Sequence, residues 1–404
     1  MKTFSELSLS PLIMANLSRN GFETPTAIQA AAIGPALAGR DLIATAQTGT
    51  GKTLAFVLPV IQSLLASRGL PSGIRTVVLS PTRELAQQTN DTFVQMAAGS
   101  RLRAAVVVGG VSEQSQLQAI RKGAQVIIAT AGRFYDFLNR GLVNLERVQI
   151  LVLDEADRML DMGFLPTIER ILAALPADRQ TLCFSATIDP AVRHLFEAHV
   201  PGGTRIEVGC VSKPVDQVDL RLYEVEQDRK LGLLHTLLQR DEGSFLVFAR
   251  TKHGADRLAR RLSDGGVKTA ALHGDRSQSQ RNQALRGFQT GSFRVLVATD
   301  IAARGIHVDG ISHVVNYDLP RAPEDFIHRV GRTGRAGARG TASTFGTRLE
   351  RSTVADIEGK LGIRLTRYSE TGNVAESQAD PMLPRPRRWQ SFAPGRGRRT
   401  RRTA

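Results

Sequence analysis

The segment 46–53 constrains the fold more than any other part of the sequence. Its residues are Ala-Gln-Thr-Gly-Thr-Gly-Lys-Thr; a strand-like run at 41–45 precedes it and an apolar helical stretch at 54–65 follows it. A glycine-rich loop between a strand and a helix presents backbone N–H groups and a helix N-terminus to phosphate groups. Loops of this kind lie at the carboxyl ends of strands in parallel sheets. We therefore predict an α/β fold with a nucleotide-binding phosphate loop.

The residue types within this loop suggest individual roles. Gly49 and Gly51 allow the backbone to approach the phosphates, and Lys52 is expected to pair with the β and γ oxygens. The Thr53 hydroxyl is a candidate ligand for Mg²⁺, and Thr48 and Thr50 complete the nucleotide-binding set. Ala46 stands where the general pattern has its first glycine, which is tolerated if that position needs no positive φ.

Short β-branched apolar runs recur between helix-like stretches, a rhythm typical of parallel sheets with crossover helices. The rhythm restarts after a segment rich in Gly, Val and Pro, and a chain of 404 residues exceeds what one core usually supports. We expect a first domain at 1–205, a linker at 206–216, a second domain at 217–368 and a tail at 369–404. The predicted strands are 41–45, 76–80, 104–108, 126–129, 150–153 and 181–184 in the first domain, and 245–248, 269–272, 295–298, 313–316 and 341–345 in the second.

Polar residues follow nearly every predicted strand, at the edge of the sheet where ligands bind. Asp154 directly follows the apolar run at 150–153 and is a candidate Mg²⁺ ligand. Glu155 is placed to orient and deprotonate an attacking water. An acidic helix N-cap is the plainer alternative for Asp154 to Asp157, and the phosphate loop upstream makes it the weaker one.

Three segments together resemble motifs of the DEAD-box RNA helicases. They are Asp-Glu-Ala-Asp at 154–157, Ser-Ala-Thr at 185–187 and His-Arg-Val-Gly-Arg-Thr-Gly-Arg at 328–335. The resemblance extends over nearly all of residues 4–345 and implies two tandem RecA-like domains that hydrolyse ATP with Mg²⁺. It also implies that Asp157, Ser185, Thr187 and His328 couple the domains.

The segment 21–29 is similar to the Q motif of this family. The resemblance implies that adenine stacks on Phe22 and that Gln29 recognises its edge, with Thr24 and Gly305 among the nucleotide-binding residues. Phe4 is either the isolated aromatic that supports this pocket or simply a Phe packed on the surface.

Arg332 and Arg335 resemble the arginine fingers of the family. Their expected role is to neutralise charge on the transferring phosphoryl group when the domains close. A run of surface arginines is the alternative, but it does not explain the interleaved glycines. With Lys52, Asp154 and Glu155, the two arginines complete the predicted catalytic set.

The resemblance also implies a sequence-tolerant grip on RNA, because backbone N–H groups, hydroxyls and guanidinium groups meet phosphates. The implied RNA-binding residues are Pro81, Thr82, Arg83, Gly109, Gly110, Thr130, Gly132 and Arg133 in the first domain, and Arg250, Gln278, Arg281, Thr299 and Arg304 in the second. Local unwinding of short duplexes follows as the expected activity. A DNA helicase and a non-catalytic RNA-binding protein are the rival interpretations.

Three residues depart from the family pattern. Ala27 and Ala131 replace prolines, and His307 stands where an Asp that contacts the ribose is usual. We expect either weaker binding of ATP, partly rescued by Asp309, or a neutral replacement. The phosphate loop and compact core look most like the RhlE group of short bacterial enzymes.

The composition favours a polyanionic partner. The formal net charge is +15, and the segment from 370 onward is rich in Arg, Pro and Gly, which predicts a disordered basic tail that tethers RNA. Cys183 and Cys210 predict reduced thiols, and no apolar stretch approaches a membrane span. We expect a cytoplasmic monomer without membrane contact, and proteins of the ribosome or of RNA decay are compatible partners.

Overall fold

The computed structural model describes residues 3–46, 49–66, 73–188, 190–208, 218–303, 308, 310–334 and 339–369. Several residues singled out in the sequence lie outside the described residues, namely Thr48, Arg304, Gly305, His307, Asp309 and Arg335. The basic segment from 370 onward and most of the expected linker also lie outside them.

Seven parallel strands form the sheet of the first domain, in the order β3-β4-β2-β5-β6-β1-β7. The strands are β1 (Leu42–Thr45), β2 (Thr76–Ser80), β3 (Ala104–Val107), β4 (Val126–Thr130), β5 (Ile150–Leu153), β6 (Gln180–Ser185) and β7 (Thr204–Glu207). The helices around them are η1 (Phe4–Glu6), α1 (Pro11–Arg19), α2 (Ala27–Leu37), α3 (Lys52–Ala66), α4 (Arg83–Met96), α5 (Glu113–Arg121), α6 (Ala131–Asn139), α7 (Ala156–Asp161), α8 (Leu165–Ala173) and α9 (Pro190–His199).

A second seven-stranded parallel sheet has the order β10-β11-β9-β12-β13-β8-β14. Its strands are β8 (Val218–Glu224), β9 (Phe245–Phe248), β10 (Thr269–Leu272), β11 (Val295–Ala298), β12 (His313–Asn316), β13 (Gly340–Gly346) and β14 (Thr366–Tyr368). Its helices are α10 (Lys230–Arg240), α11 (Lys252–Asp264), α12 (Gln278–Gln289), α13 (Asp300–Ala303), α14 (Pro323–Val330), η3 (Arg348–Glu350) and α15 (Arg351–Leu361).

Each sheet is buried on both faces. Two hydrophobic clusters pack on the first sheet and two on the second. Strands such as β5, whose four residues are all buried, are continuous apolar runs because helices cover both sides. Phe4 is also buried, in the cluster that contains α1 and α2, so it is not a surface residue.

Every strand predicted from the sequence is present, shifted by no more than one residue at either end. The α/β class and the two-sheet architecture are therefore confirmed. The sequence did not predict β7, β8 or β14. Because β7 pairs with β1 through Glu207, the first sheet extends into the start of the expected linker.

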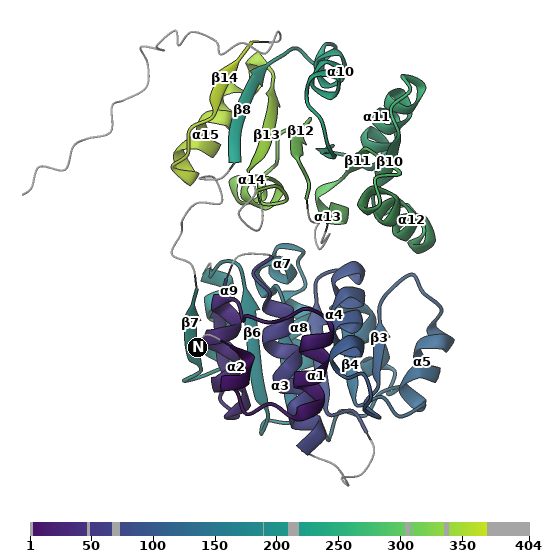
Figure 1. The fold of residues 1–404 in the computed structure, drawn as a ribbon, viewed down its shortest axis with the longest axis vertical. Coiled ribbons are helices and arrows are strands. Elements are labelled where there is room, and N and C mark those ends of the chain that lie inside the picture. The colour runs from purple at the N-terminus through teal and green to yellow at the C-terminus, as the bar shows by residue number, and fades with distance from the viewer. Residues whose placement is uncertain are drawn as a thin grey trace, which may run out of the picture.

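The carboxyl ends of the two sheets face each other. In the first domain α7 directly follows β5, and in the second domain α13 follows β11 and α14 follows β12. Figure 1 shows α7 at the upper side of the first domain, turned toward α13 and α14 at the lower side of the second. The polar loops that follow the strands of both sheets therefore meet between the domains.

Candidate ATPase site and nucleic-acid interface

The phosphate loop joins β1 to α3. Gly49 and Gly51 have φ values of 86° and 89°, which only glycine adopts at little cost. The Nζ atom of Lys52 donates to the carbonyl oxygen of Ala46 at 2.9 Å, so the side chain folds back across the loop. The backbone N–H of Ala46 in turn donates to Ser185, at the end of β6. The loop is therefore anchored to the neighbouring strand as well as to its own helix.

Gln29 connects the expected Q motif to the phosphate loop. Its Nε2 donates to the Gly51 carbonyl at 3.1 Å, and its Oε1 accepts from the Thr26 N–H at 2.9 Å. A side chain at position 51 would collide with this amide, which explains why a glycine is needed there. Phe22 is 39% exposed and Thr24 is exposed, so both are accessible to a ligand. Contact of these residues with a base stays a prediction.

Asp154 and Glu155 lie buried at the end of β5. The Oδ2 atom of Asp154 has no hydrogen-bond partner among the described residues. Burial, and next the charge of Glu155, raises the pKa of Asp154, while Lys52 opposes this. This buried carboxylate oxygen is therefore available to bind a cation that is also coordinated by the phosphates of a nucleotide.

The surroundings of Glu155 lower its pKa, in contrast to those of Asp154. Burial alone would raise the pKa of Glu155, but the positive charges of Arg158, Lys52 and Arg332 together lower it. Among the described non-glycine residues, Glu155 alone has a positive φ, at 50°. Strained backbone of this kind is retained where surrounding contacts fix it, and it clusters at functional sites. The side chain is therefore held ionised in one fixed position.

Arg158 is a site residue that the sequence did not reveal. It is 2% exposed and donates to Glu155 Oε2 at 2.5 Å, one turn along α7. Its Nε and Nη2 atoms have no hydrogen-bond partner among the described residues. An arginine three residues after the glutamate was the available signal, because i and i+3 side chains meet on a helix.

Asp157 connects the Asp-Glu-Ala-Asp segment to the Ser-Ala-Thr segment. Its Oδ2 accepts hydrogen bonds from the backbone N–H of Ala186 at 3.0 Å, and from the N–H and the hydroxyl of Thr187 at 2.9 and 3.0 Å. The Ser185 hydroxyl accepts from the Asp157 N–H and donates to the Thr187 carbonyl. The resemblance implied that these three residues couple the domains together with His328, and the structure brings the three into one network within the first domain.

Arg329 anchors the third motif within the second domain. Its guanidinium group binds both carboxylate oxygens of Asp300, at 2.6 and 2.8 Å, and also Asn316 and the carbonyl of Asp318. It lies over the ring of Phe248 and is 2% exposed. Arg329 therefore fixes α14 against the ends of β9, β11 and β12, a positioning role that the sequence analysis did not assign.

Arg332 follows α14 and is 3% exposed. Its Nε donates to the carbonyl of His328 at 3.2 Å. The positive charge of Arg332 also contributes to the lowered pKa of Glu155, although the two residues belong to different domains. The structure thus brings an arginine of the second domain toward the acidic residues of the first.

Three arginines gather where the expected RNA-binding segments meet. Burial, and then the charge of Arg281, lowers the pKa of Arg83, with a smaller contribution from Arg133. The guanidinium group of Arg83 packs against Gly109 and Gly110, where a Cβ at either position would crowd it. Both domains therefore contribute to one basic cluster, defined here by Arg83, Arg133 and Arg281.

Glu84 links the two domains directly. The Glu84 side chain is 4% exposed. It forms an ion pair with Arg281 at 2.7 Å and accepts a hydrogen bond from Gln278 at 3.2 Å. Both partners lie at the start of α12. The resemblance places Glu84 in the expected RNA-binding segment 81–84, but nothing in that segment indicates an ion-pair partner so far along the chain.

The other expected RNA contacts vary in accessibility. Pro81 and Thr82 are buried, and the Thr82 hydroxyl caps α4. Thr130 precedes α6 and Gly132 lies in its first turn. In the second domain Thr299 is buried beside α13, whereas Arg250 is exposed and forms an ion pair with Glu350 at 3.2 Å.

Comparisons with known proteins agree with this geometry. The model described as DEAD/DEAH box helicase matches residues 26–195, and the helicase conserved C-terminal domain matches residues 229–337. The DEAD-box ATP-dependent RNA helicase CshA of Geobacillus kaustophilus is 42% identical over 359 residues, which cover 89% of this chain and 76% of CshA. The chain belongs to the DEAD-box helicase family.

Solved structures of S. cerevisiae Dbp5 are similar to this DEAD-box helicase to different degrees. Dbp5 bound to RNA and ADP BeF3 has a TM-score of 0.81 at 33% identity, covering 92% of this chain and 96% of that one. A Dbp5 variant bound to Nup159, a Gle1 variant, IP6 and ADP has a TM-score of 0.59 at 31% identity, covering 90% and 96%. The domain arrangement here is thus more similar to the RNA-bound form.

Proposed function

We propose that this DEAD-box helicase is an RNA-dependent ATPase that couples ATP hydrolysis to local unwinding or remodelling of RNA. The chain belongs to the DEAD-box family, whose members include ATP-dependent RNA helicases. The observation that carries the proposal is the contact between the domains: Glu84 of the first pairs with Arg281 of the second at 2.7 Å, and in this arrangement the charge of Arg332 lowers the pKa of the buried Glu155. A site divided between two domains is active only when they close, and closure is the step that RNA binding can promote.

The nucleotide site is proposed to consist of the phosphate loop and the Q motif. Gly49, Gly51 and Lys52 receive the phosphates, and Phe22 offers an exposed ring on which adenine stacks. The Gln29 amide accepts from the backbone of Thr26 in the Q motif and donates to the backbone of Gly51 in the phosphate loop, so it also couples the base pocket to the loop. Thr24, Thr48, Thr50 and Gly305 complete the proposed nucleotide contacts.

Mg²⁺ fits the donor atoms that the site provides. Asp154 has an unpartnered buried oxygen, and Thr53 offers a hydroxyl next to Lys52. The described residues contain no group of three or more His, Cys, Asp or Glu side chains that could form an all-protein metal site. Mg²⁺ needs none here, because it is commonly bound by one or two protein oxygens together with substrate phosphates. When bound, it neutralises charge on the phosphates.

Hydrolysis then uses groups whose charge states are already set. Glu155 is ionised, so it can accept a proton from water as the oxygen of that water bonds to the γ-phosphorus. The bond between this phosphorus and the leaving ADP oxygen breaks in the same displacement. Arg332 and, by its place in the motif, Arg335 stabilise the charge that spreads over the transferring group.

Arg158 and Asp157 are proposed as positioning residues. Arg158 holds the Glu155 carboxylate, and Asp157 joins helix α7, which directly follows Glu155, to the Ser185–Thr187 segment. His328 adjoins Arg332 through its carbonyl group. Movement of the second domain changes the position of Arg332, whose charge acts on the catalytic carboxylate that Arg158 holds.

The basic cluster is proposed to bind the RNA backbone. Arg83, Arg133 and Arg281 present guanidinium groups from both domains, and Gly109 and Gly110 shape the floor beneath Arg83. Phosphate contacts of this kind carry no base sequence, so recognition is sequence-tolerant. A strand held by both domains favours the closed arrangement, which links RNA binding to hydrolysis.

Steady-state ATP hydrolysis without polymer, with single-stranded RNA and with DNA of matched sequence tests the proposal. We expect stimulation by RNA, little by DNA, and loss of activity in a Glu155→Gln control. Equal stimulation by DNA would favour a DNA helicase. No turnover in the presence of RNA would favour a non-catalytic RNA-binding protein.

Several expectations from the sequence remain proposals. They include the domain boundaries, the tethering of RNA by the basic tail, the effect of His307 on ATP affinity and the RhlE-like subgroup. Ribosomal or RNA-decay partners, the monomeric state and the cytoplasmic location belong with them. For the part of the chain that the structure describes, none of the helices is long and apolar enough to span a bilayer.

A further inference from the structure

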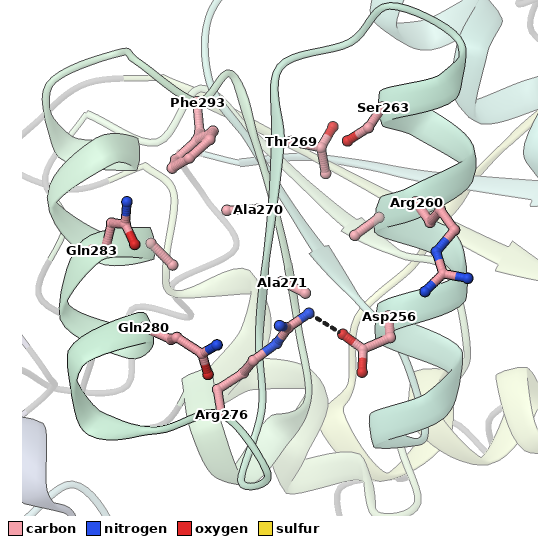
Figure 2. A pocket seen from close by; sticks show the side chains of 12 residues that line it. Asp256, Arg260, Ser263, Thr269, Ala270, Ala271, Arg276, Gln280, Gln283 and Phe293 are labelled. Atoms are coloured by element: carbon pink, nitrogen blue, oxygen red, sulfur yellow. Dashed lines mark hydrogen bonds and ion pairs between the residues drawn. The ribbon is translucent and has the colours of Figure 1, made fainter.

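A groove on the second domain lies outside the nucleotide and RNA sites. It has a volume of about 630 Å³ and runs along strand β10 between α11 and α12. Figure 2 shows β10 in the middle of the groove, with Arg260 and Asp256 on one wall and Gln280 and Gln283 on the other. The Arg276–Asp256 ion pair crosses one end of the groove, and Phe293 lies toward the other.

The floor of the groove is an open strand edge. Among the described residues β10 pairs only with β11, and it is the first strand of its sheet. The carbonyl groups of Lys268 and Leu272 accept hydrogen bonds from β11 and its flanking residues. Since the backbone groups of a strand alternate in direction, those of Thr269 and Ala271 face away from β11, into the groove.

The size of the side chains keeps this edge accessible. Ala270 and Ala271 lie along the strand, and both are only partly buried. At the far end the Phe293 ring packs against Gly287 of α12, where any Cβ would collide with it. Small residues along the strand and an aromatic ring at its end provide room for an extended backbone and a site for one apolar side chain.

The groove lining carries more positive than negative charge. Its charged residues are Arg260, Arg276 and Asp256. Asp256 is already paired with Arg276 and His273. Arg260 forms no ion pair with any described residue, and in Figure 2 the dashed line to Asp256 comes from Arg276, not from Arg260. The free charge at the groove is therefore positive.

We propose that this groove binds an acidic segment of a partner protein as an added β-strand. Backbone groups of the segment pair with Thr269 and Ala271, acidic side chains reach Arg260, and an apolar side chain packs against Phe293. Addition of a strand to an exposed edge is a common mode of peptide recognition. The basic residues at 385–402 of this chain have the wrong charge for this site.

A designed peptide tests the proposal on the full chain. The probe is a fluorescein-labelled nonapeptide that alternates glutamate with valine, and its control alternates lysine with valine. Arg260→Glu is compared with Arg261→Glu, which alters the next residue of α11 outside the groove lining. Fluorescence anisotropy measures peptide affinity, and RNA-stimulated ATP hydrolysis confirms that both variants are folded.

We expect the acidic peptide to bind more tightly than the basic one. Arg260→Glu should weaken its binding by about tenfold, because attraction becomes repulsion, whereas Arg261→Glu should change it by less than about twofold. Hydrogen exchange at the amides of Thr269 and Ala271 should slow when the acidic peptide is bound.

Several results would overturn the proposal. These are no binding of the acidic peptide at about millimolar concentration, equal effects of the two substitutions, or unchanged exchange at Thr269 and Ala271. Loss of RNA affinity in Arg260→Glu with peptide binding intact would assign the groove to RNA instead. A change in sedimentation of that variant without peptide would assign it to a second copy of the chain.

Discussion

Arg158 provides the sharpest test of how the catalytic carboxylate is held. It is 2% exposed and pairs with Glu155, which is 4% exposed, at 2.5 Å. Replacing Arg158 with Met keeps much of the side-chain volume and removes the charge. The Glu155 carboxylate then stays buried without its nearest cation, and removing one partner of a buried ion pair costs about 3–5 kcal/mol.

The double variant separates this charge effect from packing. Glu155→Gln alone leaves the arginine buried and unpaired, so it should also destabilise the first domain. Combining Arg158→Met with Glu155→Gln removes both charges, and the total loss should be at least about 2 kcal/mol smaller than the sum of the single losses. Rescue of this size requires that the two groups interact in the folded state.

Hydrogen exchange of the slowest amides of β2 and β5 is the assay, because it reports the opening free energy of the first domain alone. Arg140→Met is the matched control, since Arg140 pairs with Glu113 at 2.7 Å on the surface, where solvent screens the pair. It should have little effect on exchange. Additivity of the two single substitutions within about 0.5 kcal/mol would refute the buried pair.

Three further predictions concern the domain interface, the RNA site and pH. Glu84→Gln, which removes the charge that binds Arg281, should lower RNA-stimulated ATP hydrolysis at limiting RNA by about tenfold and leave basal hydrolysis unchanged, as measured in RNA titrations. Gly110→Ala places a methyl group against the Arg83 guanidinium and should weaken RNA binding equally for unrelated sequences, as measured by filter binding; a loss confined to one sequence would contradict this. Burial lowers the pKa of His313 to about 4, with Asp241 opposing it and Arg221 and Arg240 contributing. The ring therefore stays neutral in the folded state, and its contribution is present above the unfolded pKa of about 6.5 and is lost as pH falls toward 4. Exchange in β12 should show about 2 kcal/mol less opening free energy at pH 5 than at pH 7.5, and a pH dependence unchanged in His313→Gln would exclude this cause.

Site residues whose role depends only on their spacing within one short segment were predictable from the sequence. The phosphate loop needs glycines, a lysine and a threonine at fixed spacing, so Gly49, Gly51 and Lys52 reveal it without tertiary information. The strands before such loops are apolar runs such as 150–153, which lie in β5 as expected. The fold class and most strand positions followed from these two patterns.

Edge strands were harder to predict. β7 and β14 have four and three residues and contain charged side chains, so no apolar run distinguishes them. β8 alternates, with Val218, Leu220 and Leu222 inward, and this period of two was its available signal. The search for continuous apolar runs missed it because β8 lies near the edge of the sheet.

Long-range ion pairs could not be predicted from one sequence. Glu84 meets Arg281 only because two domains bring α4 and α12 together, and Arg329 meets Asp300 only because the fold brings α14 against the start of α13. In both cases each residue alone is an ordinary charged side chain. Their roles depend on contacts that the fold creates.

Arg332→Gln tests the central claim, that hydrolysis requires a residue from each domain, most directly. Steady-state hydrolysis at saturating RNA and equilibrium binding of ATP are measured on the same preparation. Arginine fingers contribute roughly 10³-fold or more to the rate, so we predict a loss of kcat of this order with ATP affinity changed far less. A kcat close to that of the unsubstituted protein would contradict the account.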